Sequence, residues 1–140
     1  MIEIDKLIEK CRKNGLKITP QRLAIFEALI NNRNHPSAET LHKEISKKYT
    51  TITLTTVYKT LEMLTNLGEV ASLDIDSERK HFDPHIEPHH HIICKECKQI
   101  IDVFKIDNDV KPPKDVLERF KVDGFHIDFY GTCIKCHSAA

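Results

Sequence analysis

The sequence lacks any apolar run that approaches the roughly 20 residues needed to cross a bilayer as a helix. At its start, MIEIDKLIEK, it lacks the basic residues and apolar block of a secretory signal. Internal repeats and low-complexity tracts are absent too. From these absences we expect a cytoplasmic protein.

A net charge is also missing, because 21 Lys and Arg balance 21 Asp and Glu. The balance is uneven along the chain: residues 1–68 hold eleven basic and seven acidic side chains, and residues 69–140 hold ten and fourteen. A mildly basic first half suits a polyanionic partner, although solvated helix faces would give the same counts. An apolar fraction of 40% with 30% charged residues excludes wholesale disorder. The 140 residues fit one domain or two small ones. Two small domains would each need a cross-link, such as a bound metal, or a partner chain to be stable.

The first half of the chain predicts helices. Apolar residues recur at helical spacing in four segments, residues 4–11, 23–30, 38–49 and 57–67. Thr19 followed by Pro20, and Ser37, are candidate helix starts. Gly15 and Gly68 are candidate helix ends.

After the helices the pattern changes to EVASLDIDSERKHFD, which alternates around a polar turn and predicts a two-stranded hairpin. Pro84 and Pro88 then interrupt regular structure. The second half offers short strand-like runs (HHHIIC, QIIDVF, GFHIDFYG) and a helix start at PPKDVLERF. We therefore predict an α+β fold with a winged helix-turn-helix at residues 1–83, a hinge at 84–88 and a small α/β domain at 89–140.

The cysteines form two CxxC pairs and one isolated residue, Cys11, which lies on the apolar face of the first predicted helix and suits the core. In a reducing compartment such pairs favour metal binding over disulfides. Four thiolates match the tetrahedral preference of Zn²⁺, so we predict a structural zinc site that ties the C-terminus back. A thiol–disulfide switch or free thiols are the alternatives. The predicted ligands are Cys94, Cys97, Cys133 and Cys136.

Residues 81–97 hold five of the nine histidines. In a strand His89 and His91 share one face and His90 faces the other way. If the first CxxC closes a hairpin, Asp102 lands about opposite His89. These groups form a nitrogen and oxygen ligand set suited to Fe²⁺, Mn²⁺ or Zn²⁺, whereas a solvated loop is the plainer interpretation.

Further candidates lie elsewhere in the chain. Asp83 could add an oxygen ligand and His35 a nitrogen ligand from the first half. His126, beside Asp128, could join an accessory site. We expect the remaining histidines to be surface residues: His42, His81, His85 and His137.

The segments ITPQR, HPSAETL, TLTTVYKTLEML, HHHIICKEC, QIID and YGTCIKC occur in that order, and with them the chain resembles the ferric uptake regulator family of metal-dependent transcription factors. The resemblance implies a DNA-binding winged helix, an α/β dimerisation domain and a homodimer. It implies that the four paired cysteines hold structural zinc. It also implies a regulatory site between the domains, at positions matching His35, Asp83, His89, His91 and Asp102.

Within the family, iron sensors tend to carry Glu where Asp83 and Asp102 stand, and peroxide sensors tend to carry Asp. The resemblance therefore favours a peroxide sensor in which bound Fe²⁺ reacts with hydrogen peroxide and a ligand histidine is oxidised. An iron-responsive or other divalent-metal regulator is the alternative within the family. The strand GFHIDFYG is several residues shorter than the family's usual GFxVxxHxLEIYG. This difference argues against an accessory site formed by His90, Asp109 and His126.

For DNA we expect two winged helices of a dimer to bind a near-palindromic operator, each with its recognition helix in a major groove. Basic side chains at helix starts position the duplex by contacting phosphates. A partly buried tyrosine and threonines that only cap the helix are the alternative interpretation. The predicted DNA contacts are Lys17, Arg22, Thr55, Thr56, Tyr58 and Lys59.

Two hypotheses lie outside the family. The segment HIE before the first CxxC is superficially like a zinc deaminase, but the separation is too short and Ile93 replaces the proline of that signature. We therefore expect no enzyme. A zinc-stapled thiol switch stays open, and it predicts disulfides after peroxide treatment where a histidine-based sensor predicts an oxidised imidazole.

Overall fold

The computed structural model describes residues 3–74, 76–106 and 110–138. The chain divides into two compact units, Met1–Glu87 and Pro88–Ala140. The boundary falls within the segment 84–88 for which the sequence predicts a hinge. No helix among the described residues has the length and apolarity that crossing a membrane requires.

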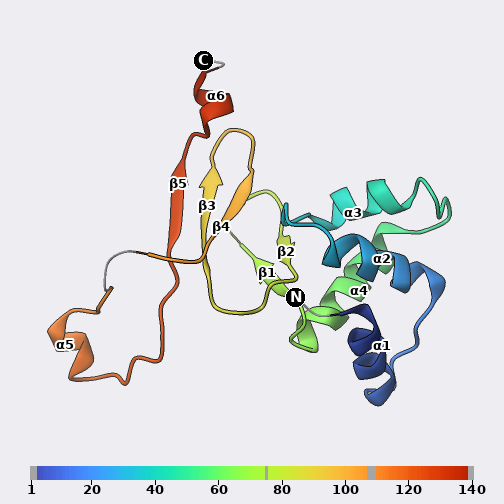
Figure 1. The fold of residues 1–140 in the computed structure, drawn as a ribbon, viewed down its shortest axis with the longest axis horizontal. Coiled ribbons are helices and arrows are strands. Elements are labelled where there is room, and N and C mark those ends of the chain that lie inside the picture. Colours follow the sequence, from blue (N-terminus) through green and yellow to red (C-terminus); the bar gives the residue numbers. More distant parts are fainter. Residues whose placement is uncertain (1–2, 75, 107–109, 139–140) are drawn as a thin grey trace. The chain divides into compact units, whose positions relative to one another are not determined.

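In the described residues the first unit holds four helices and a two-stranded antiparallel sheet, as the sequence predicts (Figure 1). The strands follow the helices in the chain, which is the order of a winged helix. The elements are α1 (Ile4–Lys13), α2 (Pro20–Ile30), α3 (Ala38–Ile45), α4 (Leu54–Asn66), β1 (Ala71–Leu73) and β2 (His81–Asp83).

Three of these helices begin at side-chain caps. The hydroxyls of Thr19, Ser37 and Thr53 each accept a backbone N–H from the residue three positions later, at 3.2 Å. Such a cap stabilises a helix by about 1 kcal/mol. At the other end, Gly15 and Gly68 have φ values of +70° and +74°, which only glycine adopts without strain. The helix boundaries are therefore set locally.

Apolar side chains from all four helices and from the hairpin form the core of this unit. Cys11 is fully buried within it, which confirms that this cysteine packs as a small apolar residue. Phe82 of β2 is buried in the same core. Its backbone N–H also donates to the carbonyl of Pro36, at 3.0 Å, so β2 is fastened to the segment that leads into α3.

The second unit contains a three-stranded sheet with the order β4-β3-β5, in which β3 pairs antiparallel with β4 and parallel with β5. This confirms the strands predicted at HHHIIC and QIIDVF. The elements are β3 (His90–Cys94), β4 (Ile100–Val103), α5 (Lys114–Leu117), β5 (Asp128–Gly131) and α6 (Ile134–Ser138).

Two predicted elements of this unit are shorter than expected. Only the last four residues of GFHIDFYG form β5. Residues 125–127 are irregular because the N–H of Ile127 donates to a side chain, His90 Nδ1, at 3.0 Å. The helix predicted at PPKDVLERF starts after Pro113 but ends within one turn, and none of its residues is buried. A helix this short gains little from its own hydrogen bonds.

The strand register gives the sheet two distinct faces, because directly opposite residues lie on the same face. On one face Ile92 lies between Ile101 and Phe129, and all three side chains are exposed. On the other face His91 lies between Asp102 and Asp128. The parallel pairing with β5 therefore brings a second carboxylate to His91.

Candidate metal centres

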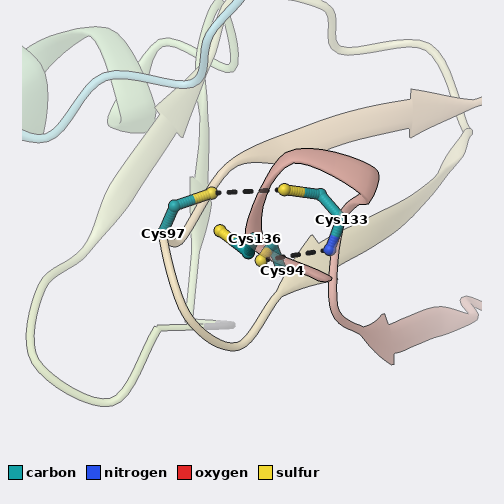
Figure 2. Close-up of side chains that lie close together, drawn as sticks. All are labelled: Cys94, Cys97, Cys133 and Cys136. Atoms are coloured by element: carbon teal, nitrogen blue, oxygen red, sulfur yellow. Dashed lines mark hydrogen bonds between the residues drawn. The ribbon is translucent and has the colours of Figure 1, made fainter. Parts of the chain in front are cut away.

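The four paired cysteines converge at one end of the second unit, and all four sulfurs lie within 4.8 Å of one another (Figure 2). Cys94 is the last residue of β3 and Cys97 lies in the turn that follows it, while Cys133 directly precedes α6 and Cys136 lies in the middle of that helix. The Sγ atoms of Cys97 and Cys133 are 3.9 Å apart. Sulfurs bound to one tetrahedral Zn²⁺ lie about 3.8 Å apart, given a Zn–S distance of about 2.3 Å. The donor set and its spacing fit zinc.

Backbone contacts hold this cluster together. The N–H of Lys95 donates to the carbonyl of Gly131, at 2.8 Å, and joins the two cysteine-bearing segments. In the first pair, the N–H of Lys98 donates to the carbonyl of Cys94, at 3.0 Å, and Lys98 has a left-handed φ of +64°. In the second pair, the N–H of His137 donates to the carbonyl of Cys133, at 2.8 Å. Each CxxC is therefore a closed turn that directs both thiols to one point.

The thiols differ in acidity because their hydrogen bonds differ. The backbone N–H of Cys133, 3.3 Å from Cys94 Sγ, lowers the pKa of the Cys94 thiol to about 6. A hydrogen bond to the thiol of Cys133 raises the pKa of Cys136 to about 12. A divalent cation at this point would stabilise the thiolate form of all four cysteines.

His35 and Asp83 lie together in the first unit. Both side chains are buried, and His35 Nε2 lies 3.3 Å from Asp83 Oδ2. His35 has a left-handed φ of +51°, a conformation that costs a residue other than glycine roughly 1–2 kcal/mol. A strained backbone at a buried pair of potential ligands is typical of a functional site.

The expectation that His81 is a surface residue is wrong. Its side chain is 12% exposed, and its Nδ1 lies 2.7 Å from the carbonyl oxygen of His35. Its Nε2 lies 2.9 Å from Asp76 Oδ2. A carbonyl oxygen only accepts, so Nδ1 carries the proton in the first contact. His81 thus ties the turn of the hairpin to the backbone of His35.

The expectation of a surface position also fails for His42, which is half-buried with Nε2 2.9 Å from the carbonyl of Ile52.

In the second unit two imidazoles converge on one carboxylate. The Nε2 atoms of His89 and His91 lie 3.1 Å and 3.3 Å from Asp102 Oδ1, and both histidines are buried. The predicted register is wrong by two residues, because Asp102 lies opposite His91 and not His89. A shift of two residues still leaves both histidines on the same face as Asp102, because alternate residues of a strand share a face. Phe104 stacks on the His89 ring at 5.4 Å and shields it from water.

The predicted accessory site is only partly described, because Asp109 lies outside the described residues. His90 Nδ1 accepts the backbone N–H of Ile127. The His126 ring lies near the His90 ring, with 5.7 Å between their centroids, and its Nε2 lies 3.2 Å from His91 Nδ1. Sequence reasoning had no signal for this contact, because it depends on where β5 lies.

The predicted DNA-contacting residues lie in the first unit. Lys17, Thr55, Tyr58 and Lys59 are exposed, while Arg22 and Thr56 are half-buried. Three of the six already have a partner within the unit. Arg22 Nη1 donates to the carbonyl of Lys17, at 2.7 Å, and Thr56 Oγ1 lies 3.0 Å from the Thr53 hydroxyl. The Tyr58 hydroxyl donates to Glu39 Oε1, at 2.5 Å.

The hydrogen bond between α4 and α3 shifts both titrating groups. The Tyr58 hydroxyl lowers the pKa of the Glu39 carboxyl, and Glu39 raises the pKa of Tyr58. The hydrogen bond fixes the ring of Tyr58 while 42% of the residue stays exposed. The surface of α4 therefore presents an aromatic ring held by a hydrogen bond, and the neighbouring Lys59 is exposed too.

Comparison with known proteins gives a consistent result. The model of the Ferric uptake regulator family matches residues 13–130. The peroxide-responsive repressor PerR of Staphylococcus epidermidis is 32% identical over 135 residues, which are 96% of this chain and 90% of that protein. The peroxide stress regulator of Campylobacter jejuni superimposes with a TM-score of 0.64 at 29% identity, covering 97% of this chain and 100% of that one.

A third protein shows the fold. The ferric uptake regulator Fur of Helicobacter pylori, whose structure is described as having three functional metal-binding sites, superimposes with a TM-score of 0.74. It is 22% identical, and the match covers 96% of this chain and 91% of that one.

Proposed function

Since the chain belongs to the ferric uptake regulator family, we propose that it is a metal-dependent DNA-binding repressor that senses hydrogen peroxide. The observation that carries this proposal is the convergence of His89 and His91 on Asp102, because two imidazoles and a carboxylate suit an exchangeable borderline cation.

The structural metal of the proposal is Zn²⁺, held by Cys94, Cys97, Cys133 and Cys136. All-sulfur coordination leaves no open position, so this ion contributes folding energy and not chemistry. It joins the turn after β3 to the C-terminal α6.

The regulatory metal is Fe²⁺ or Mn²⁺. We propose that His35 and Asp83 of the first unit and His89, His91 and Asp102 of the second unit supply its five ligands. The buried His35–Asp83 pair and the His89–His91–Asp102 group support this, since each offers nitrogen and oxygen donors of the same kind. When bound, Fe²⁺ supplies the electron chemistry with peroxide by which a ligand histidine becomes oxidised. Aspartate at both 83 and 102 favours this branch of the family over iron sensing.

Regulation would follow from ligands contributed by two units. An ion held by both units favours one relative orientation of them, and DNA that binds this orientation better is coupled to the ion in both directions. Loss of an imidazole ligand by oxidation would release that orientation. The winged helix would then leave the operator.

DNA recognition is assigned to α4, with Tyr58, Lys59 and Thr55 toward the major groove. The Tyr58 ring offers apolar contact to thymine methyl groups, and Lys59 offers a hydrogen bond to a guanine or a phosphate. Lys17 and Arg22 are the proposed phosphate contacts. The exposure of both Tyr58 and Lys59 on α4 supports the assignment.

A second copy of the chain is the proposed dimer partner. The exposed row of Ile101, Ile92 and Phe129 crosses all three strands, and a continuous apolar face of this kind marks an interaction surface. Replacing Ile101 with Glu should yield a monomer in analytical ultracentrifugation. The same change at Lys105, which is exposed, is the control.

The test of the function uses near-palindromic DNA selected from a random library with Mn²⁺-loaded protein. Protein loaded with Fe²⁺ or with Mn²⁺ is then titrated onto this DNA before and after low peroxide. Loss of binding only with Fe²⁺, with one added oxygen atom on a histidine peptide, supports the peroxide sensor. Equal binding with and without either metal would refute metal-dependent repression.

The thiol switch is a second candidate because Cys97 is exposed and its sulfur is 3.9 Å from that of Cys133. It predicts a disulfide within the cluster and release of zinc at the same peroxide dose. Mass spectrometry of the peptides distinguishes the two outcomes.

A further inference from the structure

His91 has a second contact on the side of its ring away from Asp102. Its Nδ1 lies 3.2 Å from His126 Nε2, and the other nitrogen of His126, Nδ1, lies 3.3 Å from Asp128 Oδ1. Asp128 Oδ1 is itself 3.8 Å from His91 Nδ1. The three side chains therefore form a chain from Asp128 through His126 to His91, all within the second unit.

The backbone fixes this arrangement. Asp128 is directly opposite His91 in the parallel pairing of β3 and β5. The irregular segment just before β5 is held on both sides, because the N–H of Ile127 donates to His90 Nδ1 and the carbonyl of Ile127 accepts from the N–H of His91. Phe125 stacks on the His90 ring at 5.2 Å. These contacts position the His126 ring next to Nδ1 of His91.

The order of protons along this chain follows from which atoms can donate. Asp128 Oδ1 is buried without a well-aligned hydrogen bond among the described residues, and an oxygen in that position favours a ring N–H pointing at it. If His126 Nδ1 carries its proton toward Asp128, the neutral ring has a lone pair on Nε2. That lone pair accepts from His91 Nδ1–H. His91 Nε2 is then the atom with a free lone pair, and it is the atom that lies 3.3 Å from Asp102.

We propose that Asp128, acting through His126, is a positioning residue that holds His91 in the tautomer with the proton on Nδ1. This inference rests on the proposed function, since the tautomer matters because it leaves Nε2 able to bind the regulatory metal. Partners that orient a metal-binding histidine in this way typically change metal affinity about 10–100-fold.

The same three side chains could instead hold an ion of their own, since their potential ligand atoms lie within 4.8 Å of one another. That arrangement would use both nitrogens of His91 as ligands, which requires its ring to lose both protons. A neutral ring with its proton on Nδ1 donates to His126 on one side and leaves the Nε2 lone pair able to bind a metal on the other. The geometry therefore favours the positioning role, and a second ion becomes an outcome of the test.

The first measurement is the tautomer itself, in zinc-loaded full-length protein without regulatory metal. A long-range ¹H–¹⁵N correlation spectrum of the labelled histidines distinguishes a proton on Nδ1 from one on Nε2. We expect Nδ1–H at His91 in the wild type. In Asp128→Asn, an isosteric change, the amide can present N–H to His126, so we expect His91 to shift toward Nε2–H. Exposed Asp123→Asn removes the same charge away from the chain and is the matched control.

The second measurement is binding of Mn²⁺, with free Mn²⁺ counted by electron paramagnetic resonance. We expect Asp128→Asn to weaken Mn²⁺ binding about 10–100-fold. His126→Ala should weaken it as well, because it removes the acceptor that holds the proton on His91 Nδ1. Zinc content and circular dichroism establish that each variant is folded.

Three results would overturn the positioning role. They are Nε2–H at His91 in the wild type, unchanged tautomer and affinity in Asp128→Asn, and a second Mn²⁺ per chain that both variants lose. Failure of the proposed function is a different result: the wild type would bind no Mn²⁺ beyond its zinc. The tautomer spectrum still decides the positioning role in that case, because it needs no regulatory metal.

Discussion

His91 Nε2 lies 3.3 Å from Asp102 Oδ1, and the two residues are directly opposite each other on β3 and β4. The strand pairing, and not side-chain flexibility, sets this distance. Two ligands that arrive already paired need little ordering when a cation binds, which favours affinity.

Replacing His91 with Ala should abolish Mn²⁺-dependent DNA binding while leaving a folded protein. The ring is one of three donors that converge in the second unit, and its loss leaves Asp102 with one imidazole. Electrophoretic mobility shift with the selected DNA measures the loss, and zinc content reports folding. Exposed His137→Ala is the control, and metal-dependent binding by the His91 variant would contradict the assignment.

Replacing Cys97 with Ser should remove zinc and unfold the second unit, because zinc coordination by thiolates contributes on the order of 10 kcal/mol to folding. Zinc analysis and circular dichroism measure both effects. The control is Cys11→Ala, which removes a thiol that lies in the core of the other unit. A Cys97 variant that stays folded without zinc would show that the cluster is not structural.

Replacing Tyr58 with Phe should destabilise the first unit at neutral pH and not in acid. The Tyr58 hydroxyl lowers the pKa of Glu39, so its contribution is present above the pKa of an unfolded glutamate. It is lost as the pH falls through the lowered pKa. Urea unfolding at several pH values measures this, and Glu39→Gln should show the same pH dependence.

The same Tyr58→Phe variant should keep its affinity for DNA, because the proposed contact is made by the ring and not by the hydroxyl. Tyr58→Ala should lose most of it. If the Phe variant loses affinity as the Ala variant does, the hydroxyl itself contacts DNA.

Replacing His81 with Ala should lower the free energy of unfolding of the first unit by about 1–3 kcal/mol, since the carbonyl of the buried residue His35 loses a donor. It should also weaken Mn²⁺ binding, because His81 fixes the carbonyl of the strained residue His35. Chemical unfolding and the Mn²⁺ titration measure these effects. Lys80→Ala is the control, because Lys80 is exposed and directly precedes His81 in the chain. Equal stability of both variants would show that the contact between His81 and the His35 carbonyl does not stabilise the unit.

The helices of the first unit were predictable because their causes are local. Apolar spacing, the caps at Thr19 and Ser37 and the glycines at 15 and 68 act within a few residues, and each is found where the sequence places it. The clustering of the four cysteines and the shared face of the histidines were predictable for a similar reason. A CxxC turn directs both thiols to one side, and the two-residue period of a strand puts His89 and His91 on one face.

Other relationships depended on which strands became neighbours, and local spacing carries no such information. Asp102 pairs with His91 and not with His89 because the length of the turn between Cys94 and Ile100 sets the strand register. Asp128 came to His91 only through the parallel pairing of β3 and β5, across 37 residues of sequence.

The sequence by itself therefore determined the helices, the two CxxC turns and the shared face of His89 and His91, because each depends on contacts within a few residues. Only the tertiary structure decided that the His81 ring contacts the carbonyl of His35 and that β5 brings His126 and Asp128 to the far side of His91. Those contacts join segments distant in the chain, and their geometry is fixed by packing and strand register instead of by residue spacing.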